Sequence, residues 1–551
     1  MKDVTALKKQ SFLQGAFVLI CANLLVKVIG AGFKIPLTYL IHEEGMGLFG
    51  SAYTVYTILF VIATAGFPIA ISKMVSESVA KGRDAEAKRI FRVALMLLIC
   101  VGIFGTAVIY FGADSFSEFL KMKNAVYAIR AIAPAVFCVS VMSALRGYFQ
   151  GHQNMYPTAI SEVTEAVGKL VVGYILAYKY MQISVEKAAA GAITGVTFGT
   201  LMGVLILLLI FFLKKDSAAG KNTEMRSKRS IARELVAIAV PITVGASVSS
   251  LTTLIDMATI TRRLQSITQV TAAFMTKYSS YIDASFNGGI DETLATKLYG
   301  LYNGYAIPLF NLPLTIVAAI AMSVVPAIAA AIAKHNKAES ETVTKSALRI
   351  TILLALPCGF GLFVLAKPVL MFLYQNGMAE TLLQKLSIAI VFVSLLSVTS
   401  AILQAYGRPA IPMFNMLVGG VVKIAVNYVL VGMPEFNIDG APIGTIVCYF
   451  IIVLLNMIWV LRITGCKFSI IDFVAKPVAA SAVMAAAAGI CYSLLSKTGL
   501  NFRLALLGAI AAGGIIYLLL ILLIGAIKRE DIKMLPKGDV IEKYLTKAKL
   551  L

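Results

Sequence analysis

The sequence predicts an all-α polytopic membrane protein with about fourteen transmembrane helices, arranged as two six-helix lobes and two further C-terminal helices. Three observations carry this prediction: the composition, the length of the apolar segments and an internal repeat. Of the 551 residues, 59% are hydrophobic and only 14% are charged, whereas soluble domains carry roughly 25% charged residues. A soluble fold could not bury so much apolar surface, so the solvent of this chain is lipid.

The apolar residues lie in runs of about 20, the length of an α-helix that crosses about 30 Å of hydrocarbon. The first run is long, is interrupted by Gly30, Gly32 and Pro36, and continues past Lys27. It therefore indicates an uncleaved first span rather than a signal peptide. The expected spans are, in order, 11–41, 48–72, 88–112, 125–149, 157–180, 188–213, 234–261, 298–333, 344–374, 382–406, 410–432, 440–463, 470–496 and 502–527.

The distribution of basic residues predicts the topology. The formal net charge is +21, which would suit a nucleic-acid-binding protein, but Lys and Arg gather in short clusters between the apolar runs. Roughly 32 of them fall on the side of the N-terminus and about 12 on the other side, which is the positive-inside pattern. We therefore expect a multi-pass membrane protein with both termini in the cytoplasm and no nucleic-acid partner. The longest outer connection, about 264–297, leaves no room for an outer enzyme domain.

An internal repeat relates the two halves of the chain. Lys169-Leu-Val-Val-Gly-Tyr-Ile-Leu176 matches Lys423-Ile-Ala-Val-Asn-Tyr-Val-Leu430, and the two lysines are 254 residues apart. This offset covers six predicted helices, an even number, so both halves cross the membrane in the same direction. Transporters built from parallel repeats place the substrate path between the halves.

The repeat and the basic segments divide the chain into five predicted parts. These are an N-terminal six-helix lobe (1–213), a basic cytoplasmic linker (214–233), a C-terminal six-helix lobe (234–463), two extra transmembrane helices (464–527) and a basic cytoplasmic tail (528–551).

Lysines inside the predicted spans indicate an anionic substrate. Ionisable side chains in hydrocarbon are costly and usually face a cavity or a partner. Lys27 and Lys34 lie seven residues apart on one face of the first span, and Lys423 has Asn427 one turn away. Because lysines outnumber acidic partners there, we expect these four residues to bind an anion, with phosphate the commonest biological choice.

A second set of charges predicts gating or ion-pair roles. Glu162, Glu165 and Lys169 share one face of the span 157–180, and their spacing lets Glu165 pair with Lys169. Arg146 lies at the cytoplasmic end of its span, and Asp256 lies late in another.

Purely structural roles stay open for these charges. Lys34 and Asp256 could snorkel from span ends, a Glu165–Lys169 pair could simply join two helices, and Arg146 could serve topology alone. Lys169 and Lys423, which match in the repeat, could likewise both be structural.

Motifs for chemistry are absent from the sequence. There is no GxxxxGK[ST] and no HExxH, and the three His are scattered. The seven Cys occur singly and suit reduced packing residues. We therefore predict no catalytic residue, no metal site and no cofactor, and we expect the energy to come from an ion gradient, the membrane potential, the substrate gradient or a separate protein.

Three segments resemble a known family: Glu43-Glu-Gly-Met-Gly-Leu48, Gly66-Phe-Pro-Ile-Ala-Ile-Ser-Lys73 and Arg146-Gly-Tyr-Phe-Gln-Gly-His-Gln-Asn154. They are similar to the stage V sporulation protein B family of the multidrug/oligosaccharidyl-lipid/polysaccharide (MOP) exporter superfamily, which also holds the lipid II flippases. The likeness covers essentially the whole chain.

The resemblance implies a V-shaped central cavity between two lobes and alternating-access flipping of an undecaprenyl-pyrophosphate-linked glycan, the lipid II-type peptidoglycan precursor, for sporulation. The partners it implies are the lipid-linked anionic glycan, membrane lipids, a coupling cation or the membrane potential, and wall-synthesis enzymes. The substrate role of basic residues on the flippases' first span carries over to Lys27 and Lys34. Both are Lys rather than Arg and the flippases' basic residue of span two has no counterpart, so the identity of the lipid stays open.

Other functions stay open as well. The first is an ion-coupled exporter of drugs or other small molecules from the same superfamily, which drug-resistance profiles would distinguish. A glycan polymerase or ligase would need a large outer loop with catalytic residues, which the sequence lacks. The last alternative is a non-transporting scaffold of wall synthesis.

Overall fold

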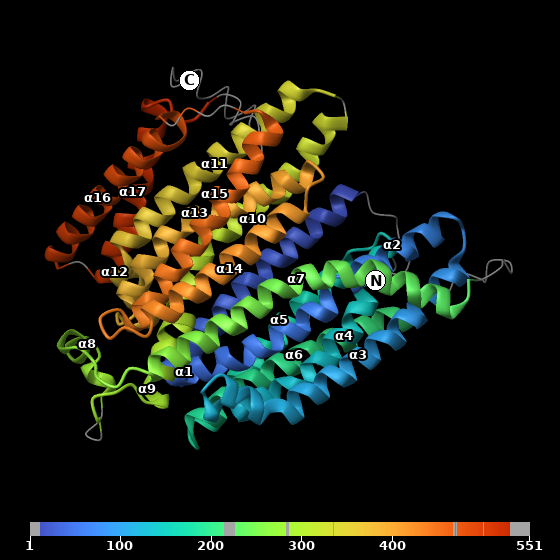
Figure 1. Cartoon of the computed structure of the whole chain (residues 1–551), viewed down its shortest axis with the longest axis horizontal. Coiled ribbons are helices and arrows are strands. Elements are labelled where there is room, and N and C mark those ends of the chain that lie inside the picture. Colours follow the sequence, from blue (N-terminus) through green and yellow to red (C-terminus); the bar gives the residue numbers. More distant parts are fainter. Residues whose placement is uncertain are drawn as a thin grey trace. The chain divides into compact units, whose positions relative to one another are not determined.

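The computed structural model describes residues 12–213, 226–282, 286–333, 335–466, 469, 471–499 and 501–528. All regular structure in these ranges is helical, which confirms the predicted all-α class (Figure 1). Residues 1–11, most of the predicted basic linker and nearly all of the predicted tail lie outside the described ranges.

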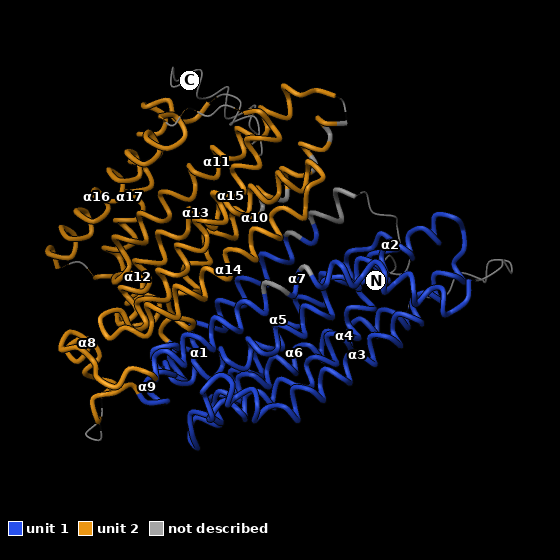
Figure 2. The backbone as a smooth tube through the Cα atoms, viewed as in Figure 1, with its two compact units in different colours: residues 1–265, 291–300 blue, residues 266–290, 301–551 orange. Residues whose placement is uncertain are grey.

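The contacts between helices divide the chain into two units, coloured separately in Figure 2. Unit 1 comprises Met1–Gln265 and Asp291–Gly300, and unit 2 comprises Ser266–Ile290 and Leu301–Leu551. The helices of unit 1 are α1 (Phe12–Thr64), α2 (Phe67–Ala80), α3 (Asp84–Phe119), α4 (Val126–Gly151), α5 (Tyr156–Met181), α6 (Val185–Leu213), α7 (Lys228–Gln265) and α9 (Glu292–Gly300). The helices of unit 2 are α8 (Ala272–Lys277), α10 (Ile307–Ala333), α11 (Lys337–Val364), α12 (Ala366–Tyr374), α13 (Glu380–Ala405), α14 (Ala410–Leu430), α15 (Gly440–Thr464), α16 (Lys476–Lys497) and α17 (Phe502–Leu523).

Helix α4 forms the centre of unit 1. Its apolar residues are not confined to one side, and most of them are buried, as in a helix with neighbours on several sides. It packs against α1, α2, α3 and α6, and Val139, Leu145 and Phe149 are almost completely buried. The polar end of α4, around Arg146, is thereby held inside the unit.

Helices α5 and α6 pack closely because α6 presents small residues to α5. Gly191, Gly195, Gly199 and Gly203 recur every fourth position of α6, which is the small-xxx-small pattern of closely packed membrane helices. A Cβ on Gly195 would overlap backbone atoms of Gly173 on α5 and would lie only 2.9 Å from the carbonyl oxygen of Lys169. The glycines therefore determine how close the charged face of α5 lies to the rest of unit 1.

We expect Gly195→Leu to separate α5 from α6. The added side chain has no space against Gly173, and overpacking of this kind costs roughly 1–3 kcal/mol or more. A thermal-unfolding measurement in detergent should show a clear decrease in Tm. A Cβ added to Gly514 of α17 would meet only open space, so Gly514→Leu is the matched control; an equal loss in both variants would contradict the packing argument.

Helix α13 is the corresponding centre of unit 2. It packs against α10, α11 and α15, while α14 packs on α15 and the α16–α17 pair packs on α11 through α16. Val398 and Ile402 of α13 are fully buried in a cluster with Val324 of α10 and Val460 of α15. The buried polar residues of α14 and α15 are thus positioned by this apolar core.

The expected break between the first two spans occurs at His42, whose φ of 53° divides α1 into two helices without a loop. Two other predicted spans, 48–72 and 344–374, are corrected by the structure. The expected second span, 48–72, is itself interrupted, since α1 ends at Thr64 and α2 begins with Pro68 in its first turn, where a proline is tolerated. The expected span 344–374 also breaks, at Leu365, between α11 and α12.

Helix α7 groups differently from the sequence prediction. The prediction assigned it to the C-terminal lobe, but the contacts place it in unit 1. The reason is that α7 packs against α1, α2, α3 and α9.

Eleven segments of the described residues are long and apolar enough to span a membrane. Helical structure covers each of the predicted spans, but neither α5 nor α7 is among the eleven. Glu162, Glu165 and Lys169 lower the hydropathy of α5. The first of the eleven, Cys21–Ala80, contains the first two predicted spans. A multi-pass membrane protein is therefore confirmed, while the number fourteen remains a prediction.

Candidate functional site

The charged face of α5 is the centre of the candidate site in unit 1. Glu162, Glu165 and Lys169 lie at positions i, i+3 and i+7 and are all partly buried. Helix α5 packs against α1 and α6 and makes fewer contacts with α4. The ionisable groups that the sequence predicted on this helix are therefore held among neighbouring helices of one unit.

Arg146 of α4 is the ion-pair partner of Glu165. Its Nη2 donates to Glu165 Oε2 at 3.1 Å, and its Nε donates to Ser161 Oγ at 3.0 Å. The side chains of Arg146 and Glu165 are only 14% and 25% exposed. The sequence predicted that Glu165 pairs with Lys169. The structure corrects this prediction, because Arg146 of α4 binds the Glu165 carboxylate and the Lys169 ammonium lies over aromatic rings of α1.

Lys169 is held over aromatic rings of α1. Its Nζ lies 5.3 Å from the ring centroid of Phe33 and 5.1 Å from that of Tyr53, within the range of a cation–π interaction. The aromatic row continues along α1 from Tyr53 to Tyr56 and Phe60, with successive ring centroids 5.8 and 5.6 Å apart.

Sequence reasoning missed this aromatic row, although the sequence carries a signal for it. Phe49, Tyr53, Tyr56 and Phe60 are spaced by four, three and four residues, which places them on one helical face. The ammonium of Lys169 therefore has an aromatic partner that its own helix does not reveal.

Lys34 of α1 lies near Lys169. It is partly buried and within electrostatic range of Lys169, and its carbonyl oxygen accepts a hydrogen bond from Thr38 Oγ1 at 2.5 Å. Lys27, two turns earlier on α1, is exposed.

Together, Lys34, Arg146 and Lys169 supply three positive charges, and Glu162 and Glu165 supply two negative ones. We call these five residues the unit 1 charge cluster. When all five are ionised, the cluster carries one excess positive charge.

Glu162 has an incompletely satisfied carboxylate. Its Oε2 is buried and has no hydrogen-bond partner among the described residues, although Arg146 and Glu165 are both within electrostatic range. Buried polar atoms without a partner are uncommon in folded proteins and call for an explanation such as a bound ion or proton. Glu162 can therefore take up a proton or a cation without losing an existing hydrogen bond.

Asp256 of α7, in unit 1, is almost completely buried, with 5% of its surface exposed. It lies on the helix that packs against α1, α2 and α3. The depth of its burial disfavours the explanation that it snorkels from the end of a span.

Lys423 and Asn427 lie one turn apart on α14 in unit 2. Lys423 is partly buried, and Asn427 is fully buried. A Cβ on Gly444 of α15 would overlap Asn427 Oδ1, so the glycine is what lets α15 approach this side chain. These two predicted residues and the unit 1 charge cluster belong to different units.

A buried polar network in unit 2 was not predicted. Asn415 of α14 donates from Nδ2 to Asn456 Oδ1 of α15 at 2.8 Å, and Asn456 Nδ2 donates to Thr399 Oγ1 of α13 at 3.2 Å. Such bonds join membrane helices. The available signal was an Asn inside each of two predicted apolar spans, Asn415 in 410–432 and Asn456 in 440–463.

Within the described part of the chain, no group of three or more His, Cys, Asp and Glu side chains could hold a metal ion. The predicted absence of a metal or cofactor stays a prediction.

Two family models match the chain. The model described as "Polysaccharide biosynthesis protein" matches residues 12–332, and the model described as "MatE" matches residues 303–429. The first covers all of the unit 1 charge cluster, and the second covers Lys423 and Asn427.

Curated relatives match along most of their length. The chain is 26% identical to stage V sporulation protein B of Bacillus subtilis (strain 168) over 534 residues, which cover 96% of this chain and 98% of the relative. It is 25% identical to the lipid II flippase MurJ of the same organism, covering 83% of this chain and 84% of the flippase.

The fold also matches a solved structure. The structure of lipid II flippase MurJ in an inward closed conformation aligns with a TM-score of 0.66 and 15% identity, covering 92% of this chain and 98% of that chain. This likeness shows the fold.

Proposed function

Because the chain belongs to the polysaccharide biosynthesis protein family, we propose that it is a flippase for an undecaprenyl-pyrophosphate-linked glycan. It is a multi-pass membrane transporter of the MOP superfamily, related to the lipid II flippase, and it is not an enzyme. The proposed substrate is a lipid II-type precursor of peptidoglycan, and the relationship to stage V sporulation protein B supports a role in the spore cortex. The proposed location is the bacterial cytoplasmic membrane, with both termini in the cytoplasm.

The excess positive charge of the unit 1 charge cluster is the observation that carries this proposal. A pyrophosphate linker bears negative charge, and a partly buried site strengthens its attraction to ammonium and guanidinium groups. Lys34 is the proposed pyrophosphate ligand of the cluster, and Lys27, exposed on the same helix, is proposed to attract the headgroup first. Lys423 and Asn427 of unit 2 are proposed to bind the substrate as well.

The Arg146–Glu165 ion pair and Glu162 are proposed to couple transport to an ion gradient. Arg146 neutralises one of the two carboxylates directly, and Glu162 retains an oxygen without a partner among the described residues. A proton or cation that binds Glu162 would change the charge balance around Arg146 and thereby favour one conformation over another. Alternating access would then move the substrate across the bilayer.

An ion-coupled multidrug exporter is the second candidate. The MatE match to residues 303–429 favours it. An exporter of organic cations would need an excess of negative charge at its site, the opposite of the unit 1 charge cluster. A scaffold role, and an association with wall-synthesis enzymes, are the remaining candidates.

The test is flipping of a fluorescent undecaprenyl-pyrophosphate glycan in proteoliposomes. We expect protein-dependent flipping that falls roughly tenfold or more in Lys34→Ala, because a charge-assisted contact is worth about 1.5–3 kcal/mol. Lys27→Ala and Lys423→Ala should reduce flipping as well. Lys179 is an exposed lysine of α5 beyond the cluster, and Lys179→Ala is the control that should keep the wild-type rate.

Two outcomes would contradict the proposal. Wild-type protein that does not flip the lipid, even with a potential and an ion gradient imposed, would favour another anionic substrate or the scaffold. Flipping that is unchanged in all three lysine variants would show that these cations do not bind the substrate.

A further inference from the structure

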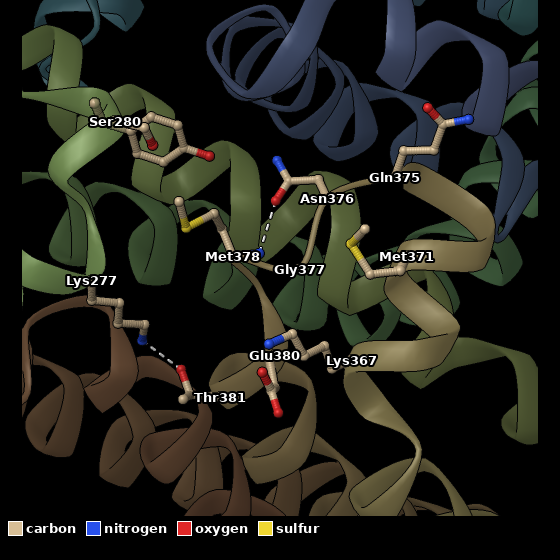
Figure 3. A pocket seen from close by; sticks show the side chains of 11 residues that line it. Lys277, Ser280, Lys367, Met371, Gln375, Asn376, Gly377, Met378, Glu380 and Thr381 are labelled. Atoms are coloured by element: carbon tan, nitrogen blue, oxygen red, sulfur yellow. Dashed lines mark hydrogen bonds between the residues drawn. The ribbon is translucent and has the colours of Figure 1, made fainter. Parts of the chain in front are cut away.

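Unit 2 contains a pocket that is separate from Lys423 and Asn427. It has a volume of about 640 Å³ and is partly open to solvent, and ligand sites commonly fall between about 300 and 1,000 Å³. Its lining comes from α8 with the following turn, from α12, and from the connection between α12 and α13 (Figure 3). The break at Leu365, which separates α12 from α11, places Lys367 and Met371 in this lining.

One edge of the pocket is a network around Asp439. Lys277 Nζ donates to Thr381 Oγ1 at 2.6 Å, as Figure 3 shows, and to Asp439 Oδ2 at 3.0 Å. Thr381 Oγ1 in turn donates to Asp439 Oδ1 at 2.8 Å. Lys385 Nζ also lies 3.7 Å from Asp439 Oδ2. Among the described residues of this network, a single carboxylate thus serves two ammonium groups, so the network carries one excess positive charge.

Tyr278 does not compensate that charge. Its ring lies 4.9 Å from Lys277 Nζ. Burial, followed by the charge of Asp439, raises the pKa of Tyr278 well above its usual value. The phenol therefore stays neutral.

Lys367 adds a second cation to the pocket. Its side chain is exposed, and its stem lies beside Gly377, where an added Cβ would be 3.6 Å from Lys367 Cγ. It makes no hydrogen bond or ion pair with any described residue. Glu380 also lines the pocket, so Lys277, Lys367 and Lys385 face two carboxylates, and the pocket region keeps an excess positive charge.

The remaining polar lining consists of neutral groups. The side chains of Ser280 and Gln375 line the pocket and make no hydrogen bond within the described part of the chain. Gln375 adopts a left-handed backbone conformation, with φ 51° and ψ 22°, where α12 ends. Tyr281 supplies an aromatic ring to the same lining. Hydroxyl, amide and aromatic groups around a cation suit a ligand that has both hydroxyl groups and a negative charge.

We propose that this Lys367 pocket binds an anionic sugar, with its acidic group against Lys367 and Lys277 and its hydroxyl groups against Ser280, Gln375 and Thr381. The positive-inside distribution assigns this end of unit 2 to the outer side of the membrane. The pocket would therefore hold the headgroup of a lipid-linked glycan after it has crossed. The assignment of the ligand as a transported headgroup rests on the proposed function, whereas the binding of an anionic sugar does not.

The test measures binding of soluble sugars to the full chain in nanodiscs by calorimetry. The probes are N-acetylmuramyl dipeptide, which carries a free carboxylate on its peptide, the uncharged disaccharide of N-acetylglucosamine, and inorganic phosphate. We expect the muramyl peptide to bind at least tenfold more tightly than the other two, and Lys367→Ala to weaken its binding roughly tenfold or more. Lys497 is an exposed lysine at the end of α16, and Lys497→Ala should bind as the wild type does. Gln375→Ala is a second variant that keeps the charge of the pocket. It should weaken the binding of the muramyl peptide and leave the binding of phosphate unchanged.

Each outcome decides the proposal. No binding of the muramyl peptide, or equal binding by wild type and Lys367→Ala, overturns it, and phosphate that binds as tightly as the muramyl peptide overturns the assignment to a sugar. Flipping by the same purified protein, reconstituted in proteoliposomes, is measured in parallel. A protein that binds the peptide but does not flip the lipid contradicts only the proposed function, and one that flips the lipid but does not bind the peptide contradicts only the Lys367 pocket.

Discussion

Replacing Arg146 with methionine should lower the free energy of unfolding by about 3–5 kcal/mol, the usual cost of leaving a buried charge without its partner. In the variant, Glu165 loses the guanidinium that lies 3.1 Å from its Oε2, and Ser161 loses the Nε donor. The remaining Glu162 and Glu165 would then repel each other across one helical turn. Thermal or denaturant unfolding in detergent measures the loss, and flipping in proteoliposomes should fall with it.

The double variant Arg146→Met/Glu165→Leu separates the ion pair from the packing of its side chains. Removing both charges leaves no uncompensated partner, so we expect the double variant to be more stable than Arg146→Met alone. The comparison also needs the single variant Glu165→Leu. If the losses of stability in Arg146→Met and Glu165→Leu add up to the loss in the double variant, Arg146 and Glu165 have no direct coupling, and the ion pair does not explain the loss in Arg146→Met. A double variant that is stable but does not flip the lipid would support a role for the pair in transport.

The sequence was sufficient for the class of fold and for the positions of most helices. Runs of apolar residues determine where a membrane helix lies, so even the charged helix α5 was recognised as a span. The breaks at Thr64 and Leu365 were not predicted, because the apolar runs continue through them. Helix α7 belongs to unit 1 because it packs against α1 and α2. Contacts between helices that are far apart in the sequence cannot be predicted from the pattern of residues along the chain.

The candidate site was predicted in its residues but not in its contacts. The spacing along α5 placed Glu165 and Lys169 on one face, and four-residue spacing suggested that they pair. Arg146 lies on another helix, and only the packing of α4 near α5 shows that it reaches Glu165 first. The cation–π partner of Lys169, Tyr53, likewise lies on another helix, α1. Partners that come from different helices require the register of one helix against another, which periodicity within a helix does not specify.

Replacing Lys34 with glutamate should abolish flipping of the pyrophosphate-linked lipid. The substitution changes the excess charge of the unit 1 charge cluster from one positive to one negative. A pair of unit charges about 5–6 Å apart interacts by about 3 kcal/mol at an effective dielectric constant of about 20, so the loss should be roughly a hundredfold or more. Lys169 is within electrostatic range of position 34 and can pair with the new carboxylate, so we expect the protein to remain folded. Initial flipping rates in proteoliposomes measure the effect, with Lys179→Glu on α5 as the matched inversion outside the cluster.

The same substitution separates the two candidate functions, because they need opposite charge at the site. Lys34→Arg keeps the positive charge and adds a planar donor that can bind phosphate in a bidentate manner, so it should flip the lipid at least as well as the wild type. Transport of a cationic dye by Lys34→Glu, together with lost lipid flipping, would show that the sign of this charge selects the substrate. If the wild type already exports the dye and Lys34→Glu flips the lipid as fast as the wild type, the cluster is not an anion site and the multidrug exporter becomes the better explanation.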